Sequence, residues 1–320
     1  MSSKPTSKGA IRTVREKGTD ISNVLPPVAE LISDRPSLFE FVNLDGLPQK
    51  IDFRQRASQD PMPLPMPVDR EGYGTVQNSP RFWATGLGDW LNAREAMSRF
   101  LVADNDRDEL RILDFGCATG RFLRQCWVDR ESMGLDLWGC DFARQNVDWS
   151  KRHLERDIKI LLNNDNPHLP FADQYFDMVT AFSVFTHIDE FEDAWLLELR
   201  RITRIGGLLY LTIQNEATWK KVLDRPGTFQ HLSNANRVAG NMQIAPELFQ
   251  HDMPSERIAL RMSESDVYTC NVWMSNKYVQ QNWGRYFDLL HIADNAHNSF
   301  QSVVVLAPQS ATPRQSRLIR

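Results

Sequence analysis

Short apolar runs alternate with longer amphipathic stretches between Leu110 and Ile213, and this rhythm constrains the fold more than any other feature of the chain. The apolar runs predict buried strands, and the stretches between them predict helices. Because parallel strands need a crossover connection, the alternation predicts a parallel sheet with helices on both faces. The predicted strands are residues 111–115, 137–140, 158–162, 176–182 and 207–213, and the predicted helices are residues 121–128, 142–155 and 190–203.

The rhythm changes after Ile213. Residues 214–266 are polar and irregular, as expected of an inserted lid. A helix is predicted over residues 275–283, and the strands predicted over residues 287–292 and 300–306 are close enough in sequence to pair antiparallel. The expected fold class is α/β: a seven-stranded, doubly wound, mostly parallel sheet whose last strand is antiparallel, with an N-terminal helical arm and a lid inserted after the fifth strand.

The N-terminal third lacks this rhythm. Alternating prolines from Pro61 to Pro67 forbid a helix and favour an extended strap, which could be a spacer, a segment packed on the surface or a ligand for an SH3-type domain. Residues 81–102 predict one or two amphipathic helices, with Gly86 and Gly88 weakening the first half. We expect a disordered tail (1–20), an N-terminal arm or cap (21–105), a domain that holds the alternating sheet (106–308) with a substrate lid at about 214–266, and a loose tail (309–320).

Composition excludes several classes of protein. No run approaches the roughly 20 apolar residues that a membrane-spanning helix needs. The 4 cysteines show neither CxxC pairing nor metal-ligand spacing, so we expect no disulfide scaffold and no metal site. A net charge of −4 argues against a protein that mainly binds nucleic-acid phosphates. We expect a cytoplasmic monomer or homodimer; the basic start faintly resembles a transit peptide but lacks an amphipathic helix.

A glycine-rich turn joins the first predicted strand to the helix that follows it. Residues 114–121 read DFGCATGR, and the glycines let a ligand approach the backbone because no Cβ obstructs it. The second predicted strand ends at Asp141. An acidic side chain about 20 residues after such a loop can accept hydrogen bonds from both hydroxyls of a ribose. Together these features predict an adenosine-containing cofactor at the carboxyl ends of the strands.

The same loop separates two kinds of adenosine cofactor. A dinucleotide loop has glycine at its first, third and sixth positions, which here hold Gly116, Ala118 and Arg121, so the third glycine is missing. Asp114 adds a carboxylate, which would repel a pyrophosphate and attract an ammonium and a sulfonium. The loop therefore favours S-adenosylmethionine over NAD.

Over residues 110–307 the chain resembles the class I S-adenosylmethionine-dependent methyltransferases. The resemblance rests on the loop at 114–120, on Asp141, and on segments 164–165, 169–188 and 200–212 in the expected order. Ala118 stands where the family most often has glycine. The resemblance implies a Rossmann-like methyltransferase domain that binds S-adenosylmethionine through Asp114, Gly116, Cys117, Ala118, Gly120, Arg121, Asp141, Phe142, Asn164, Asp165 and Ser183.

His187 follows the fourth predicted strand and is the candidate catalytic residue. An imidazole titrates near neutrality and can act as a general base. A structural role, ordering its loop or capping the next helix, is the alternative. A base is needed only for a hydroxyl or a protonated amine acceptor, because the sulfonium already activates the methyl group and positioning supplies most of the acceleration.

We expect the methyl acceptor to be a small molecule or a saccharide-like compound, methylated on oxygen or nitrogen by in-line transfer. Residues 181–185 lack the Asn/Asp-Pro-Pro-Tyr/Phe run of enzymes that methylate amines of DNA bases, and no cysteine follows a proline. The variable segments 21–102 and 214–266 would select the acceptor. Two alternatives stay open: a non-catalytic relative that binds the cofactor or a partner, and an NAD-linked oxidoreductase.

Overall fold

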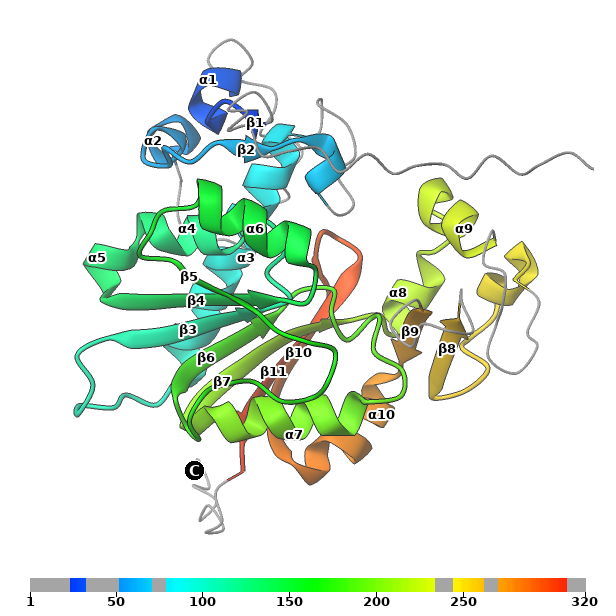
Figure 1. Ribbon diagram of the computed structural model, residues 1–320. Helices are drawn as coiled ribbons and strands as arrows, with labels where there is room; N and C mark the ends of the chain where they lie inside the picture. Colours follow the sequence, from blue (N-terminus) through cyan, green and yellow to red (C-terminus); the bar gives the residue numbers. More distant parts are fainter. Residues whose placement is uncertain (1–23, 33–51, 71–78, 234–243, 262–269, 310–320) are drawn as a thin grey trace, which may run out of the picture.

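The computed structural model describes residues 24–32, 52–70, 79–233, 244–261 and 270–309 (Figure 1). The predicted tail at 1–20 and nearly all of the tail at 309–320 lie outside the described residues. In the described ranges, no helix is both long enough and apolar enough to cross a membrane.

A seven-stranded sheet forms the centre of the molecule, in the order β10-β11-β7-β6-β3-β4-β5. Strands β5, β4, β3, β6 and β7 pair in parallel, whereas β11 runs antiparallel to both of its neighbours. The predicted α/β fold, with an antiparallel last strand, is therefore confirmed. The strands are β3 (Leu110–Phe115), β4 (Leu135–Asp141), β5 (Lys159–Leu162), β6 (Phe176–Ala181), β7 (Thr203–Ile213), β10 (Phe287–His297) and β11 (Gln301–Pro308).

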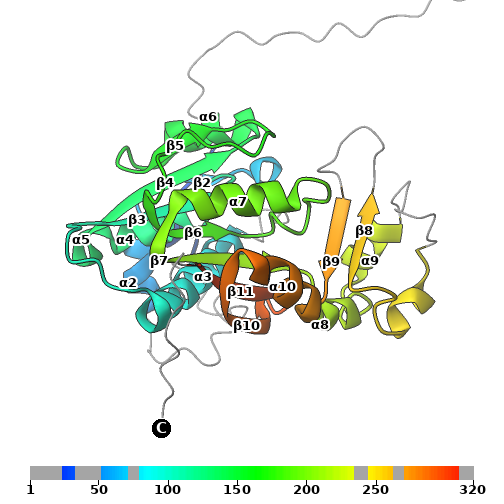
Figure 2. The same cartoon turned by 90° about the horizontal axis from the view of Figure 1, so that it is seen from below.

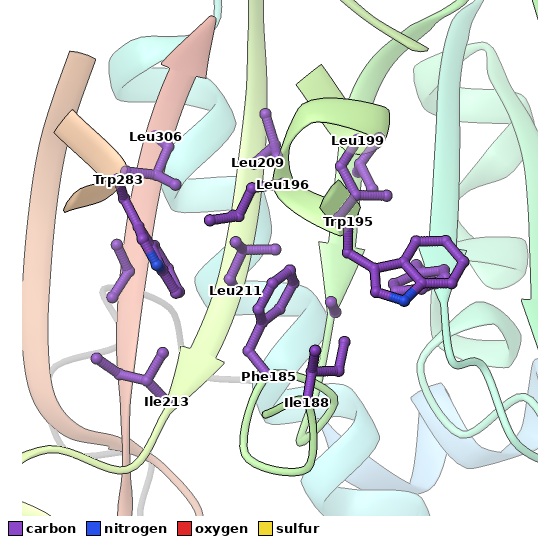
Figure 3. Close-up of a cluster of buried hydrophobic side chains, with 14 of the residues drawn as sticks. Phe185, Ile188, Trp195, Leu196, Leu199, Leu209, Leu211, Ile213, Trp283 and Leu306 are labelled. Atoms are coloured by element: carbon purple, nitrogen blue, oxygen red, sulfur yellow. The ribbon is translucent and has the colours of Figure 1, made fainter. Parts of the chain in front are cut away.

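Helices cover both faces of this sheet. Successive residues of a strand point to opposite faces, so Leu209 and Leu211 of β7 join the core layer under α7 and α10, and Leu208 and Tyr210 join the layer under α3, α4 and α6. Figure 3 shows the first layer, where Trp195 packs beside the sheet. The helices are α3 (Ser79–Phe100), α4 (Leu123–Val128), α5 (Arg130–Met133), α6 (Arg144–His153), α7 (Glu192–Ile202), α10 (Asn276–Asn282) and the short 3₁₀ helix η5 (Trp283–Arg285).

The proline-rich segment, residues 61–67, packs onto the sheet domain together with its flanking residues, and residues 60–70 are called the strap from here on. Met62 and Leu64 are buried, and the buried Asp60 carboxylate accepts hydrogen bonds from Nε and Nη2 of Arg124 in α4, at 2.7 and 3.1 Å. Of the roles considered for the strap, the structure thus favours a segment packed on the surface. The elements of this region are β1 (Val24–Leu25), which pairs antiparallel with β2 (Leu64–Pro65), the helices α1 (Val28–Ile32) and α2 (Phe53–Ser58), and the 3₁₀ helix η2 (Pro67–Asp69).

The segment after β7 is more regular than its sequence suggests. We expected residues 214–266 to be irregular, and in the described part this is wrong. β8 has three apolar residues between two arginines, Arg257 and Arg261, which is too short a run to distinguish from a loop. The elements are α8 (Glu216–Lys220), α9 (Pro226–Ser233), the 3₁₀ helix η4 (Pro246–Gln250), and β8 (Arg257–Arg261), which pairs antiparallel with β9 (Cys270–Met274).

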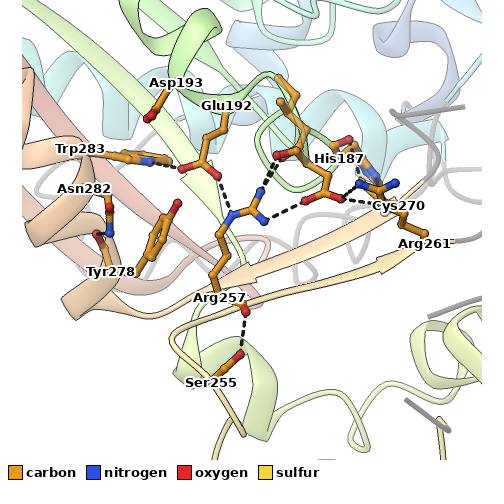
Figure 4. Close-up of polar contacts among 12 residues, drawn as sticks. His187, Glu192, Asp193, Ser255, Arg257, Arg261, Cys270, Tyr278, Asn282 and Trp283 are labelled. Atoms are coloured by element: carbon orange, nitrogen blue, oxygen red, sulfur yellow. Dashed lines mark hydrogen bonds and ion pairs between the residues drawn. The ribbon is translucent and has the colours of Figure 1, made fainter. Parts of the chain in front are cut away.

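Ion pairs hold the β8–β9 hairpin against the loop that precedes α7 (Figure 4). Arg257 Nη1 lies 2.8 Å from Asp189 Oδ1 and its Nε lies 2.8 Å from Glu192 Oε2, while Arg261 Nε donates to Asp189 Oδ2 at 2.7 Å. Burial acts to raise the pKa of Asp189, but the hydrogen bonds from the two arginines outweigh it and lower that pKa. The hairpin is thereby tied to the segment that carries His187.

Gly86 allows α3 to lie directly on the glycine loop. A Cβ at this position would lie 2.3 Å from the carbonyl oxygen of Arg121, which is main chain and cannot rotate away. We predict that Gly86→Ala lowers the free energy of unfolding by about 1–3 kcal/mol, the usual cost of overpacking. The measurement is denaturant unfolding of the purified variant.

Gly227 in α9 supplies the matched control. A Cβ there would meet nothing within 4 Å, so Gly227→Ala should leave stability unchanged or raise it by up to about 1 kcal/mol. Equal stability changes for the two variants would contradict the close approach of α3 to the loop.

Candidate functional site

The glycine loop between β3 and α4 has a backbone that ordinary side chains disfavour. Gly116 and Gly120 have φ values of +75° and +74°, and Ala118 between them has φ +45°. A Cβ on Gly116 would lie 2.5 Å from Cγ2 of Val184, and one on Gly120 would lie 2.4 Å from Cδ1 of Leu154. Both glycines are therefore required by conformation and by packing. At Ala118, an L-residue in this region costs roughly 1–2 kcal/mol, which explains why glycine suits the position.

Asp141, at the carboxyl end of β4, holds the loop and the next helix together. Its Oδ2 accepts the backbone N–H of Ala118 at 2.8 Å, and its Oδ1 accepts the backbone N–H of Ala143, the N-cap of α6, at 2.8 Å. The side chain is 6% exposed. Asp141 therefore contacts both the loop and the residue that precedes α6, while α6 itself has no side-chain cap at Ala143.

Asp114 lies buried at the end of β3. Thr180 in β6 donates its hydroxyl to Asp114 Oδ1 at 2.8 Å. Burial raises the pKa of this carboxyl to about 7, although the hydrogen bond from Thr180 and the charge of Arg121 act to lower it. A cation bound beside Asp114 would favour its ionised form, so the residue is suited to receive positive charge.

Arg121, a predicted cofactor residue, faces α3. Its Nη1 donates to Asp89 Oδ2 at 2.5 Å, and its guanidinium lies 5.8 Å from the ring centroid of Phe182. The other oxygen of Asp89 lies 2.8 Å from Nδ1 of the buried His297 at the end of β10. Burial acts to raise the pKa of Asp89, but His297 and Arg121 outweigh it and lower that pKa. Asp89 and His297 were not among the predicted residues, because no local pattern links α3 to β10.

The remaining predicted cofactor residues line the carboxyl edge of the sheet. Phe142 follows Asp141 and is 63% exposed, while Asn164 and Asp165 are exposed just after β5. Cys117 is buried, and burial raises the pKa of its thiol well above the ordinary value, so its backbone matters more than its sulfur.

The loop after β6 carries the two other predicted residues. Ser183 has φ +58°, donates its backbone N–H to Thr212 Oγ1 at 2.7 Å and donates its hydroxyl to Gln301 Oε1 at 3.0 Å. The imidazole of His187 is exposed, and its Nδ1 lies 2.6 Å from the carbonyl oxygen of Cys270 in β9. The β8–β9 hairpin therefore fixes the orientation of His187 (Figure 4).

The structure thus brings the predicted residues to one edge of the sheet, after strands β3, β4, β5 and β6. Arg121 is the residue whose observed partners differ most from the expectation. No cluster of three or more potential metal-ligating side chains occurs in the part of the chain that the structure describes.

Comparisons with known proteins agree with this geometry. Residues 113–211 match the family model described as a methyltransferase domain. An uncharacterized protein of Methanocaldococcus jannaschii is 29% identical over 122 residues, which cover 38% of this chain and 48% of that protein. The match therefore spans about half the length of this curated relative.

Solved structures with the same kind of fold include three archaeal proteins. A Haloferax volcanii methyltransferase in complex with the activator Trm112 has a TM-score of 0.45 and 17% identity, covering 70% of this chain and 93% of that one. The PH0226 protein of Pyrococcus horikoshii has a TM-score of 0.44 and 15% identity, covering 72% and 96%. A Methanosarcina mazei S-adenosylmethionine-dependent methyltransferase has a TM-score of 0.41 and 16% identity, covering 66% and 96%.

The matched segment begins inside β3 and ends inside β7, so it contains the glycine loop, Asp141 and the loop after β6. These are the elements that the fold brings to the carboxyl edge of the sheet. The NAD-linked alternative is not carried forward, because the matched family is that of methyltransferases. The described α/β fold therefore contains a segment, residues 113–211, that matches a methyltransferase domain.

Proposed function

We propose that this protein transfers the methyl group of S-adenosylmethionine to an oxygen or nitrogen of a small-molecule or saccharide-like acceptor. The observation that carries the proposal is the pairing of two carboxylates, Asp141 and Asp114, with the left-handed glycine loop. When bound, S-adenosylmethionine supplies a methyl group already activated by a sulfonium.

Different residues at the carboxyl edge of the sheet would bind different parts of S-adenosylmethionine. Asp141 stands at the end of β4 with its carboxylate oriented by two backbone N–H groups, which suits it to accept hydroxyls of a ribose. Asp114 is buried beside the loop and suits the cationic end of the molecule. The exposed ring of Phe142 offers an apolar face on which the adenine ring could pack.

His187 is the proposed general base. In the neutral imidazole, Nδ1–H donates to the Cys270 carbonyl, which leaves Nε2 as the nitrogen that carries the lone pair. A hydroxyl acceptor would give its proton to Nε2 as its oxygen bonds the methyl carbon and the C–S bond of the sulfonium breaks. An ammonium acceptor would give its proton to Nε2 first, because only the neutral amine has a lone pair with which to attack the methyl carbon. The exposed ring can then release that proton to water.

The acceptor class rests on the composition of the chain and on the absence from residues 181–185 of the Asn/Asp-Pro-Pro-Tyr/Phe run of DNA-base methyltransferases. A net charge of −4 disfavours nucleic acid as the substrate. The strap and strand β8 belong to the segments that the sequence assigns to acceptor selection. The strap contacts Thr119 of the glycine loop, and β9, the partner strand of β8, contacts His187.

Two measurements, made one after the other, test the proposed methyltransferase activity. Titration calorimetry with S-adenosylmethionine should show binding; its absence would refute the proposal. Methyl transfer from labelled S-adenosylmethionine should then appear with at least one member of a panel of small alcohols, amines and saccharides. Binding without transfer to any acceptor would favour the non-catalytic relative of the fold.

Removing the Asp141 charge should weaken cofactor binding. We predict that Asp141→Asn raises the Kd for S-adenosylmethionine by roughly 5- to 150-fold, the equivalent of about 1–3 kcal/mol for a lost charged hydrogen-bond partner. Asp136→Asn is the control, because Asp136 lies at the other end of the same strand and pairs with Lys159 at 2.6 Å. Equal Kd values for Asp141→Asn and the wild type would refute the ribose-binding role.

The pKa of Asp114, about 7, predicts pH-dependent binding. A cationic ligand binds the ionised carboxyl, so affinity should fall up to about tenfold per pH unit below about pH 7. In the ligand-free protein the sign is opposite: stability from the protonated form is present below the ordinary pKa and is lost as pH rises through about 7.

Asp114→Asn should therefore bind S-adenosylmethionine more weakly at about pH 8 and should lose the dependence between about pH 5.5 and about pH 8. Calorimetric titrations across this range measure both effects. A variant that keeps the wild-type pH dependence would show that another group titrates.

His187→Ala should reduce turnover of a hydroxyl acceptor by about 10²- to 10⁴-fold, the usual contribution of a general base. The Kd for S-adenosylmethionine should not change, because His187 is proposed to act on the acceptor. Intact turnover would show that His187 only orders its loop.

A further inference from the structure

The strap is in direct contact with the glycine loop. Thr119 of the loop donates its hydroxyl to the backbone carbonyl of Asp69, the last residue of η2, at 3.2 Å. Asp69 also lies near the end of α6: burial and Arg152 lower the pKa of His153, and the Asp69 carboxylate opposes that shift. The last turn of the strap thus lies beside both elements that Asp141 joins.

The strap is held in this position by buried polar contacts. Arg124 in α4 donates to both oxygens of Asp60 and to the backbone carbonyls of Met62 and Pro63, at 2.6 and 3.2 Å. Trp83 in α3 donates its indole N–H to Asp60 Oδ2 at 2.7 Å. Arg124 and Asp60 have no exposed side-chain surface. Breaking such a pair would leave a buried charge, so the strap is a fixed part of the domain.

Val68, in this fixed segment, is an apolar residue with a largely exposed side chain. Val68 is 84% exposed although it directly precedes Asp69, and Phe142, which directly follows Asp141, is 63% exposed. Among the large apolar side chains of the described residues, these two are the most exposed. Because Val68 directly precedes Asp69, whose carbonyl Thr119 of the glycine loop contacts, its exposed side chain starts within one residue of the loop, where a bound ligand could cover it.

We propose that Val68 is a specificity-determining residue of the cofactor site and packs on the adenosine part of bound S-adenosylmethionine. This inference rests on the proposed function. An apolar side chain gains by covering a purine or a ribose face and gains nothing beside the charged amino-acid end, which Asp114 is placed to receive. The strap, although distant in sequence from the methyltransferase segment at 113–211, would then complete the site.

The test uses variants that cannot disturb the core. Val68→Ser and Val68→Asp change an 84% exposed side chain, so both should keep the wild-type melting temperature. We expect the Kd for S-adenosylmethionine to rise about fivefold for Val68→Ser, and further for Val68→Asp, as measured by calorimetry. Val102→Ser is the matched control, because Val102 is also an exposed valine (52%) but lies elsewhere. Its backbone N–H donates to the carbonyl of Gly206, in the first half of β7.

A second ligand locates the contact. 5′-Methylthioadenosine has the adenosine part without the amino-acid group, so its Kd should rise by the same factor in Val68→Ser, which changes no charge. An unchanged Kd for S-adenosylmethionine in Val68→Ser, or a loss seen with S-adenosylmethionine but not with 5′-methylthioadenosine, overturns the inference. Failure of the wild type to bind S-adenosylmethionine refutes the proposed function itself, a result distinct from either of these.

Discussion

The bond between the Asp141 carboxylate and the backbone N–H of Ala118 is the contact on which the candidate site depends. It links the end of β4 to a loop in which three residues have positive φ values. A loop in this conformation would relax without a partner, since left-handed backbone at a non-glycine residue is costly. Because the other oxygen of Asp141 accepts the backbone N–H of Ala143, directly before α6, one side chain joins the strand end, the loop and the start of the helix.

Charge gives this edge its chemical character. Three carboxylates lie around the loop, those of Asp114, Asp89 and Asp141. The charges of Asp89 and Asp141 both act to raise the pKa of Asp114. Arg121 neutralises part of this charge through Asp89, which also binds His297. An edge of this kind would bind a cation more readily than a pyrophosphate, because like charges repel most strongly where water is excluded. The structure therefore agrees with the distinction that the loop sequence makes between two adenosine cofactors.

Much of the fold could be predicted because its signals are local. Each parallel strand is a short apolar run that ends at a turn, and the positions of Gly116, Gly120 and Asp141 follow from those strand ends. The β8–β9 hairpin was missed because its apolar runs are short and flanked by arginines that find partners only in the folded protein.

The contacts of Asp89 could not be predicted for a related reason. Asp89 binds Arg121 and also His297, which is 208 residues away, and no periodicity connects them. The strap presents the same difficulty, since the bond between Arg124 and Asp60 joins residues separated by 64 positions. Local patterns thus predict the strand ends that carry the motif, while the contacts that surround the motif require the assembled structure.

A crystal structure with S-adenosylmethionine bound tests the central claim most directly. Both ribose hydroxyls should lie within about 2.5–3.2 Å of the Asp141 carboxylate. The amino-acid end should lie on the side of Asp114. A cofactor bound with its ribose away from Asp141, or at another edge of the sheet, would contradict the ribose-binding role of Asp141.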